Sequence, residues 1–548
     1  MKKFILHFFA AIFASVMLNL CINAQTRTDI YAITNARIFT AAGAAIEKGT
    51  VVIRDGLIEE VGANVRVPAD ARVIEGSGLT VYPGFFDAAT NLGIAAPTPA
   101  LPTLGQRVTI SQTPAAQSNS NYPNGLQPEN KAVEQLKAGD AQFEAQRNAG
   151  ITTALTVGRD GIFNGQSALI NLAGDSVSEM IVSEPIAQHV TFRTLGGTYP
   201  TSLLGTFSAL RQMFLDAARL QEIQKMYAKN PRGLPRPAAD ASLEALIPAL
   251  NRQMPVVFNA NSEREIVRAL DLAQEFNLAA IIAGGQEAWK QADRLKKQNV
   301  PVLLSLNFPK RTTAASPEAD PETLEILRLR VETPKCAARL QQAGVKFAFQ
   351  SGGMTNPNDF LANAAKAVEN GLSGDDAIRA MSLNAAEIFG VDNRLGTIET
   401  GKIANLVVSR GDILSKNKTI TQVFIDGKLF EPKEKSKTPI PPNGTTTAGF
   451  ANVSGTYSIS IQVPGQAIPA TLTLVGQGGN LSGSLQSQFG TSQIEGEVTA
   501  EGFNFRTTAD FAGRSSEINV SGKVAGNQIS GTFTTQQGAT QFSGTKVP

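Results

Sequence analysis

Hydrophobic and polar positions follow two different periodic patterns along the 548-residue chain. Residues 31–82 contain short runs in which apolar and polar positions alternate, and glycines such as Gly62 and Gly76 separate these runs. Alternation with a period of two indicates β-strands, because successive side chains of a strand point to opposite faces. The first part of the chain is therefore predicted to be a small β-sheet module.

From about residue 250 the pattern changes to short apolar runs separated by segments with helical periodicity. The predicted strands of this part lie at residues 255–258, 279–283, 301–306 and 345–349. Ser262 and Glu265 form a capping box that starts the first intervening helix. Earlier strand candidates lie at residues 88–93, 152–157 and 168–172. Strands that alternate with helices favour βα units, so we expect an α/β protein with a TIM-type (β/α)8 barrel over residues 83–390.

The segments after the predicted barrel return to strand patterns. Residues 391–430 contain short strands, and we expect them to join residues 25–82 in one composite β-module. Residues 431–449 are rich in lysine and proline, which predicts an extended linker. Residues 450–548 alternate apolar with polar positions and are rich in Gly, Ser, Thr and Gln. This last segment is predicted to be an all-β appendage, either an antiparallel barrel or a sandwich.

The first 24 residues have the pattern of a secretory signal peptide. Two lysines precede an apolar run from Phe4 to Leu20, and the small residue Ala24 precedes the expected cleavage site. Lipidation at Cys21 and an uncleaved membrane anchor are the alternatives. We expect cleavage, export to the periplasm or the exterior of a bacterium, and no membrane span after cleavage.

Charge, cysteine and histidine counts narrow the possible functions. The chain has 49 Lys+Arg and 47 Asp+Glu, and removal of the leader with its two lysines leaves 47 of each sign. A balanced charge argues against nucleic-acid binding. After cleavage Cys336 is the single cysteine, so no intrachain disulfide is expected. The two histidines are His7 and His189, which excludes a site that needs several imidazoles.

Motifs at both ends of the predicted barrel resemble those of the amidohydrolase superfamily. The segment from Val81 to Asp87 (VYPGFFD) resembles the entry to that family's first barrel strand. Residues 383–390 resemble the family's closing helix, residues 396–408 resemble its return strand, and residues 423–428 resemble its last strand. Residues 149–153 and 165–169 are similar to exported imidazolonepropionase-like members. This resemblance, over about residues 31–430, implies a barrel whose strand ends hold one or two divalent metal ions that activate water for hydrolysis of carbon–nitrogen bonds.

The metal ligands that the resemblance implies are replaced in this chain. After Asp87 the family has two histidines at alternate positions, where this sequence has Ala89 and Asn91. Asn259 stands where a later strand would carry a histidine, and Gly352 stands where the family has the aspartate that binds metal and acts as base. We therefore expect no metal, no cofactor and no catalytic residue of the family's kind.

Other candidate groups have simpler structural interpretations. Asp87 together with Asn91 would form a weak site for a hard cation, but a structural aspartate at the start of the strand fits the motif better. Cys336 and His189 are a conceivable nucleophile pair, but they fall in different βα units. We interpret Cys336 as a core residue and His189 as a structural histidine.

Uncharged polar residues remain at the predicted strand ends that open onto the barrel mouth. They are Asn91, Asn259, Asn307, Gln350 and Ser351. Amides donate and accept hydrogen bonds but bind zinc poorly and cannot act as a base, so converging amides would hold a small polar ligand. The alternative is that these are ordinary residues at loop starts.

These observations predict an exported amidohydrolase-like pseudoenzyme that binds a small polar ligand with little or no catalysis. The alternative is a hydrolase of non-peptide carbon–nitrogen bonds that uses an unconventional or metal-free site. A third interpretation is a structural or adhesion protein whose functional part is the segment 450–548.

Overall fold

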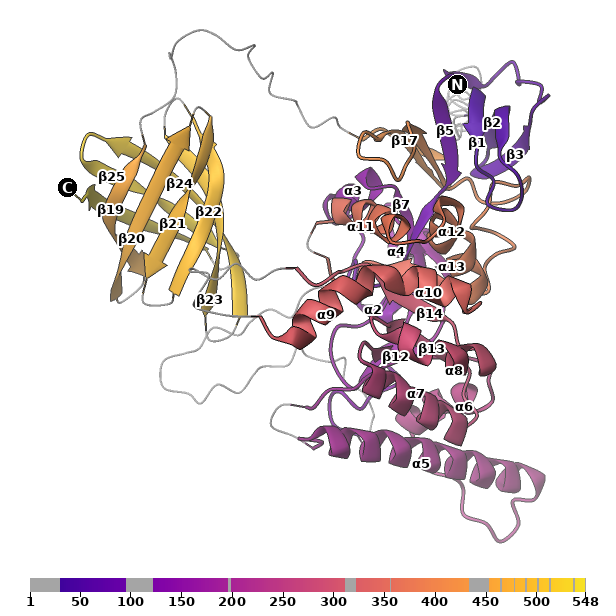
Figure 1. Cartoon of the computed structure of the whole chain (residues 1–548). Coiled ribbons are helices and arrows are strands. Elements are labelled where there is room, and N and C mark those ends of the chain that lie inside the picture. Colours follow the sequence, from indigo (N-terminus) through magenta and orange to yellow (C-terminus); the bar gives the residue numbers. More distant parts are fainter. Residues whose placement is uncertain are drawn as a thin grey trace, which may run out of the picture. The chain divides into compact units, whose positions relative to one another are not determined.

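The computed structural model describes residues 30–94, 122–195, 199–310, 322–354 and 356–432, and residues 453–547 apart from short gaps at 464–465, 478, 488–489, 500–501, 512–513 and 536–537. The described residues form two compact units, one within residues 30–432 and one within residues 453–547 (Figure 1). The predicted signal peptide, His7 and the predicted linker after residue 432 lie outside the described residues.

The first unit contains an eight-stranded sheet to which the segments before and after the barrel both contribute. Its strands are β1 (Tyr31–Ile38), β2 (Ile46–Arg54), β3 (Leu57–Gly62), β4 (Arg72–Glu75), β5 (Leu79–Pro83), β16 (Leu406–Arg410), β17 (Thr419–Ile425) and β18 (Lys428–Phe430). Their order is β18-β17-β16-β5-β1-β2-β3, with β4 paired to β1. The two segments meet where β5 pairs antiparallel with β16. Apolar side chains from both, including Ile33, Val81 and Leu406, share one buried core.

A barrel of mostly parallel strands forms the rest of the first unit. Its strands are β6 (Phe85–Thr90), β7 (Ile151–Thr156), β8 (Phe163–Gln166), β9 (Ala168–Asn171), β11 (Gln188–Thr191), β12 (Val256–Ala260), β13 (Ala280–Gly284), β14 (Val302–Ser305) and β15 (Phe347–Gln350). β6 pairs in parallel with β7, and β11 to β15 pair in parallel in chain order. β15 lies beside β6, and the short strand β10 (Ile181–Ser183) extends the sheet beyond β9. The TIM-barrel-like domain expected from the sequence is thus present.

One position in the barrel departs from the expected eight parallel strands. β8 and β9 together fill the place between β7 and β11, and they run antiparallel to both neighbours. The reason is the connection from β7 to β8, which consists of residues 157–162 and contains no helix. Parallel neighbours need a longer crossover, so this short connection reverses the strand direction.

Helices surround the barrel strands and bury the outward-facing side chains. They are α2 (Ala132–Gln135), α3 (Asp140–Asn148), α4 (Val177–Met180), α5 (Leu203–Lys229), α6 (Ala241–Leu250), α7 (Glu263–Glu275), α8 (Ala292–Lys297), α9 (Leu324–Glu332), α10 (Cys336–Gln342), α11 (Asn358–Glu369), α12 (Gly374–Ala380) and α13 (Leu383–Ile388), with 3-10 turns η1 (Ala288–Gln291) and η2 (Thr333–Lys335). The capping box of Ser262 and Glu265 at the start of α7 is confirmed. Val257 belongs to the inner core, whereas Val256 and Phe258 belong to the layer under the helices, as strand alternation requires.

The second unit is a closed antiparallel barrel, which confirms the predicted all-β appendage. Its strands are β19 (Gly455–Val463), β20 (Gln466–Gln477), β21 (Asn480–Ser487), β22 (Gly490–Val498), β23 (Phe503–Phe511), β24 (Arg514–Ala525), β25 (Gln528–Thr535) and β26 (Gly538–Lys546). β26 pairs with β19 and closes the barrel. Tyr457, Leu472, Phe505, Val520 and Phe533 are among the buried side chains that fill its interior.

Of the helices in the described ranges, none combines the length and the apolar character that crossing a bilayer requires.

Candidate ligand-binding site

The positions where the resemblance places metal ligands are filled by local packing and hydrogen bonds. Ala89 is buried in the inner core of the barrel. The Asn91 amide nitrogen donates to the Val157 carbonyl at 2.7 Å. Gly352 has a φ of +61°, and a Cβ atom built there would lie 2.1 Å from Ser305 Oγ. A carboxylate side chain at position 352 would therefore collide with Ser305.

The donor chemistry at the strand ends does not fit a zinc-type or two-metal centre. Such centres need imidazole, thiolate or carboxylate ligands, and the aligned positions carry Ala89, Asn91, Asn259 and Gly352 instead. Within the described ranges, no group of three or more His, Cys, Asp and Glu side chains is placed to hold a metal ion. The residues present do not fit the metal ions of the superfamily.

The predicted mouth residues form separate local contacts. Asn259 donates to Thr191 Oγ1 at 2.8 Å, and Thr191 in turn donates to Asn164 Oδ1 at 2.6 Å. Gln350 donates to the Leu303 carbonyl at 2.7 Å. Asn307 donates to the Gly352 carbonyl at 3.1 Å. These amides bind the ends of neighbouring barrel strands to one another.

A cavity of about 210 Å³ lies beside β6 and the loop that follows β15. Asn91 and Ser351, two of the five predicted residues, line it together with Asp87 and Arg159, and Leu92 and Phe360 supply apolar surface. Asn259, Asn307 and Gln350 are not among its lining residues. The structure thus brings two of the five predicted side chains to one cavity and places the other three elsewhere.

Asp87 is the buried acid of this cavity. Its Oδ1 atom accepts hydrogen bonds from the backbone N–H of Ser351 at 2.8 Å and of Ala89 at 3.4 Å. The contact with Ser351 connects the middle of β6 to the residue that follows β15. Burial raises the pKa of Asp87 to about 6, although the hydrogen bonds from Ser351 and Ala89 act to lower it. Asp87 therefore changes its charge in the mildly acidic range.

Sequence reasoning missed Arg159, the positively charged member of the cavity. Its guanidinium group donates to the carbonyls of Ile94 and Asn91 and so holds the loop after β6 against the loop after β7. Arg159 lies two residues after the predicted strand at 152–157, in a loop that follows a barrel strand. Barrel sites are built from such loops, so this position could have indicated a site residue. An exposed arginine in a loop is common, so the signal was weak.

The conceivable nucleophile pair of His189 and Cys336 has separate partners. His189 Nε2 lies 2.9 Å from Ser167 Oγ, and Cys336 Sγ donates to the Gly285 carbonyl at 3.5 Å. Burial lowers the pKa of His189 to about 3 and raises that of Cys336 to about 12. His189 and Ser167 are each 1% exposed and line neither of the cavities described in this section. This geometry supports a structural role for both His189 and Cys336.

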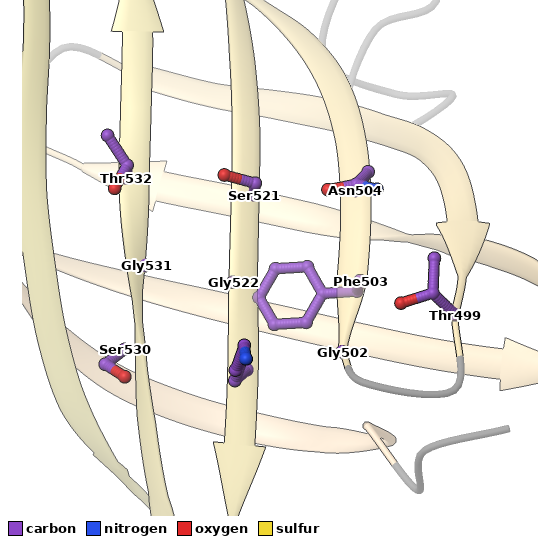
Figure 2. A pocket seen from close by; sticks show the side chains of 10 residues that line it. Thr499, Gly502, Phe503, Asn504, Ser521, Gly522, Ser530, Gly531 and Thr532 are labelled. Carbon is purple, nitrogen blue, oxygen red and sulfur yellow. The ribbon is translucent and has the colours of Figure 1, made fainter.

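The second unit has a larger, open cavity of about 430 Å³ on strands β23 to β25 (Figure 2). Asn504, Ser521 and Thr532 are paired across these strands, and Gly522 and Gly531 form the next row. A Cβ atom at Gly522 would lie 2.6 Å from the Phe503 ring, so glycine is required for that ring to pack there. The cavity is lined by the Phe503 ring, by hydroxyl, amide and backbone groups, and by one cation, Lys523.

Comparison with known proteins agrees with this architecture. Residues 261–430 match the model of the amidohydrolase family. An amidohydrolase from Thermotoga maritima MSB8, known from its crystal structure, is 25% identical with a TM-score of 0.61, covering 73% of this chain and 100% of its own. The TIM-barrel-like domain and these matches define the class: the chain belongs to the amidohydrolase superfamily.

Curated relatives are more distant or match only in part. Amidohydrolase tasK of Hapsidospora irregularis is 23% identical over 408 residues, which are 69% of this chain and 39% of that protein. A dihydroorotase of Anaeromyxobacter dehalogenans (strain 2CP-C) is 40% identical over 65 residues, which are 12% of this chain and 15% of that protein. The matched regions thus span less than half the length of either relative.

Proposed function

We propose that this amidohydrolase-superfamily protein binds a small polar ligand in the cavity beside β6 and does not use the divalent-metal chemistry of its superfamily. One observation carries the proposal. Two of the metal-ligand positions are taken by Ala89, a buried core residue with no donor atom in its side chain, and by Gly352, where a side chain would collide with Ser305, while a polar cavity that contains Asp87 lies beside them.

The hydrogen-bonding groups of the cavity favour a ligand that donates N–H groups. The Asn91 amide nitrogen and the Arg159 guanidinium already donate to backbone carbonyls. The Asn91 amide oxygen and the Asp87 carboxyl group retain lone pairs that can accept further hydrogen bonds. Amines and primary amides supply the matching donors, and an ammonium group gains from the negative charge of ionised Asp87.

The experiment uses methylammonium, acetamide and glycinamide as probes, with binding followed by ligand-observed NMR. Asn91→Leu removes the acceptor oxygen and should weaken binding about fivefold, because one hydrogen bond is worth about 1 kcal/mol. Asn259→Leu is the matched control, since Asn259 is also a half-buried amide with a bonded donor but does not line the cavity. Failure of all three probes to bind, or an equal loss in both variants, would contradict the proposal.

Export remains part of the proposal and is supported by the leader pattern of residues 1–24. N-terminal sequencing of protein recovered from an expressing bacterium tests it directly. We expect the mature chain to begin at Gln25, and a chain that retains Met1 in the cytoplasmic fraction would contradict export.

A further inference from the structure

Helix α5 extends beyond the part of the first unit that it helps to bury. Its buried positions end at Leu220, although the helix continues to Lys229. The loop of residues 230–240 then leads to α6. Figure 1 shows this loop at the C-terminal end of α5, below the helix and on its side away from the barrel strands. Gln221 donates to Asn251 at 2.8 Å, so the base of the α5–α6 pair is fixed while its end is free of core contacts.

This end of the helix pair, here called the basic tip, comprises residues 223–239. It carries four cations, Lys225, Lys229, Arg232 and Arg236, and no aspartate or glutamate. All four side chains are exposed, and none has an ion pair with a described residue. In a chain whose total charge is +2, this is a strong local concentration of positive charge.

The acidic groups next to the basic tip are already engaged in other contacts. Glu222 pairs with Arg219 at 3.4 Å on the preceding turn. Asp240 caps α6 by accepting from the Leu243 backbone N–H at 3.0 Å. Glu244 accepts from Gln224 at 3.4 Å. These acids stabilise the base of the helix pair and leave the four cations available to an external anionic partner.

Apolar side chains lie among the cations of the basic tip. Met226 is 47% exposed and Leu234 is 44% exposed, and both flank the cations in sequence. Three prolines keep the loop free of helix and strand. Exposed apolar side chains interspersed with Lys and Arg suit the boundary between lipid headgroups and acyl chains, where cations meet phosphates and apolar groups enter the bilayer. A nucleic acid or an acidic polymer would offer no comparable environment for Met226 and Leu234.

We propose that the basic tip docks the protein on an anionic lipid surface. Each cation near such a surface strengthens binding about fivefold at low salt, and the effect weakens as salt screens the charges. The inference is independent of the cavity beside β6, because the residues of the basic tip belong to α5 and the loop after it and none of them lines that cavity.

The test is co-sedimentation of the full chain with phosphatidylcholine vesicles that contain or lack phosphatidylglycerol, at low and high salt. The test variant combines K225Q, K229Q, R232Q and R236Q. The control variant combines K48Q, K297Q, K366Q and K416Q, which remove the same charge from exposed lysines elsewhere in the first unit that form no ion pair with a described residue. Both variants keep the same N-terminal segment, so a difference between them reports the tip alone.

We expect the wild type to bind the anionic vesicles in a salt-sensitive way. The vesicle affinity should fall at least tenfold in the tip variant, whereas in the control variant it should change only by the general effect of the lost charge. M226S with L234S should weaken vesicle binding while leaving retention on polyglutamate unchanged. Three results would overturn the proposal. The first is equal binding of the tip and control variants to vesicles, and the second is no preference for anionic vesicles. The third is tip-dependent binding to polyglutamate or single-stranded DNA that is tighter than binding to vesicles. Melting temperatures of both variants that equal the melting temperature of the wild type would show that the substitutions leave the fold intact.

Discussion

At the scale of single residues, Asp87 is the titratable group that links the cavity to the stability of the barrel. It is 3% exposed, and burial raises its pKa from 3.8 to about 6. The folded protein therefore holds the proton of Asp87 more tightly than the unfolded chain does. Its contribution to stability is fully present below about pH 4 and is lost as the pH rises through 6, by roughly 3 kcal/mol in total.

Asp87→Asn tests this charge effect because asparagine cannot ionise. Between about pH 4 and pH 7, the free energy of unfolding of the variant should gain roughly 3 kcal/mol relative to the wild type. Urea denaturation of both proteins at the two pH values measures this difference, and effects common to both proteins cancel. A difference that is the same at both pH values would show that Asp87 titrates normally. Methylammonium binding to the wild type should also strengthen above about pH 6, where Asp87 is ionised.

Gly352 and Gly353 form a matched pair that tests the steric argument against a metal-binding carboxylate. Both have positive φ angles, +61° and +78°, but only at Gly352 would a Cβ atom collide with a neighbour, Ser305. Gly353→Ala should cost about 1 kcal/mol from backbone strain alone. Gly352→Ala should cost at least about 1 kcal/mol more, as overpacking in a closed site does. Equal costs in thermal denaturation would mean that position 352 has room for a side chain.

At the scale of secondary-structure elements, a buried polar network joins the composite sheet to the barrel. Asn405, which precedes β16, donates to Thr153 Oγ1 at 3.1 Å and to Asn171 Oδ1 at 2.9 Å. Its own oxygen accepts from the Asp426 backbone N–H at 2.8 Å. Asn171 also donates to the Asp426 carboxylate at 2.7 Å. The network connects β7 and β9 of the barrel to the segment that returns to the sheet.

Asn405→Ala should destabilise the first unit by about 3 kcal/mol, because it leaves several buried partners without hydrogen bonds. Asn417→Ala is the control, since Asn417 is exposed and its side chain has no hydrogen bond with a described residue, and it should change stability by less than about 0.5 kcal/mol. Chemical denaturation followed by circular dichroism gives both values. A small effect of Asn405→Ala would show that the network does not couple sheet and barrel.

The positions of the strands could be predicted from the sequence more readily than their directions. Alternation along residues 31–82 reveals strands because one face of the sheet is buried. The run at 168–172 also predicted a strand, and β9 is there, but an apolar run carries no information on strand direction. The direction of β8 and β9 depends on the short connection after β7. Similarly, strand ends pointed to Asn91 and Ser351. Asn259 does not line their cavity, because it lies on β12, which two strands separate from β15 in the sheet.

At the scale of the whole molecule, the chain combines an amidohydrolase-fold unit with a closed eight-stranded barrel. The second unit has its own core and no unpaired edge strand, because β26 pairs with β19. A fragment of residues 450–548 should therefore fold by itself and unfold in one cooperative transition. Dispersed amide resonances and a sigmoidal melting curve would support this, whereas a random-coil spectrum would show that the barrel needs the first unit.

The central claim is that the first unit has the superfamily's fold without its metal chemistry. The most direct measurement is the metal content per chain, by inductively coupled plasma mass spectrometry, of protein purified without chelators and without a metal-affinity tag. Ala89, Asn91, Asn259 and Gly352 offer no ligand set for zinc, manganese or iron, so we predict far less than one equivalent of each. Near one or two equivalents of any of these metals per chain would contradict the account.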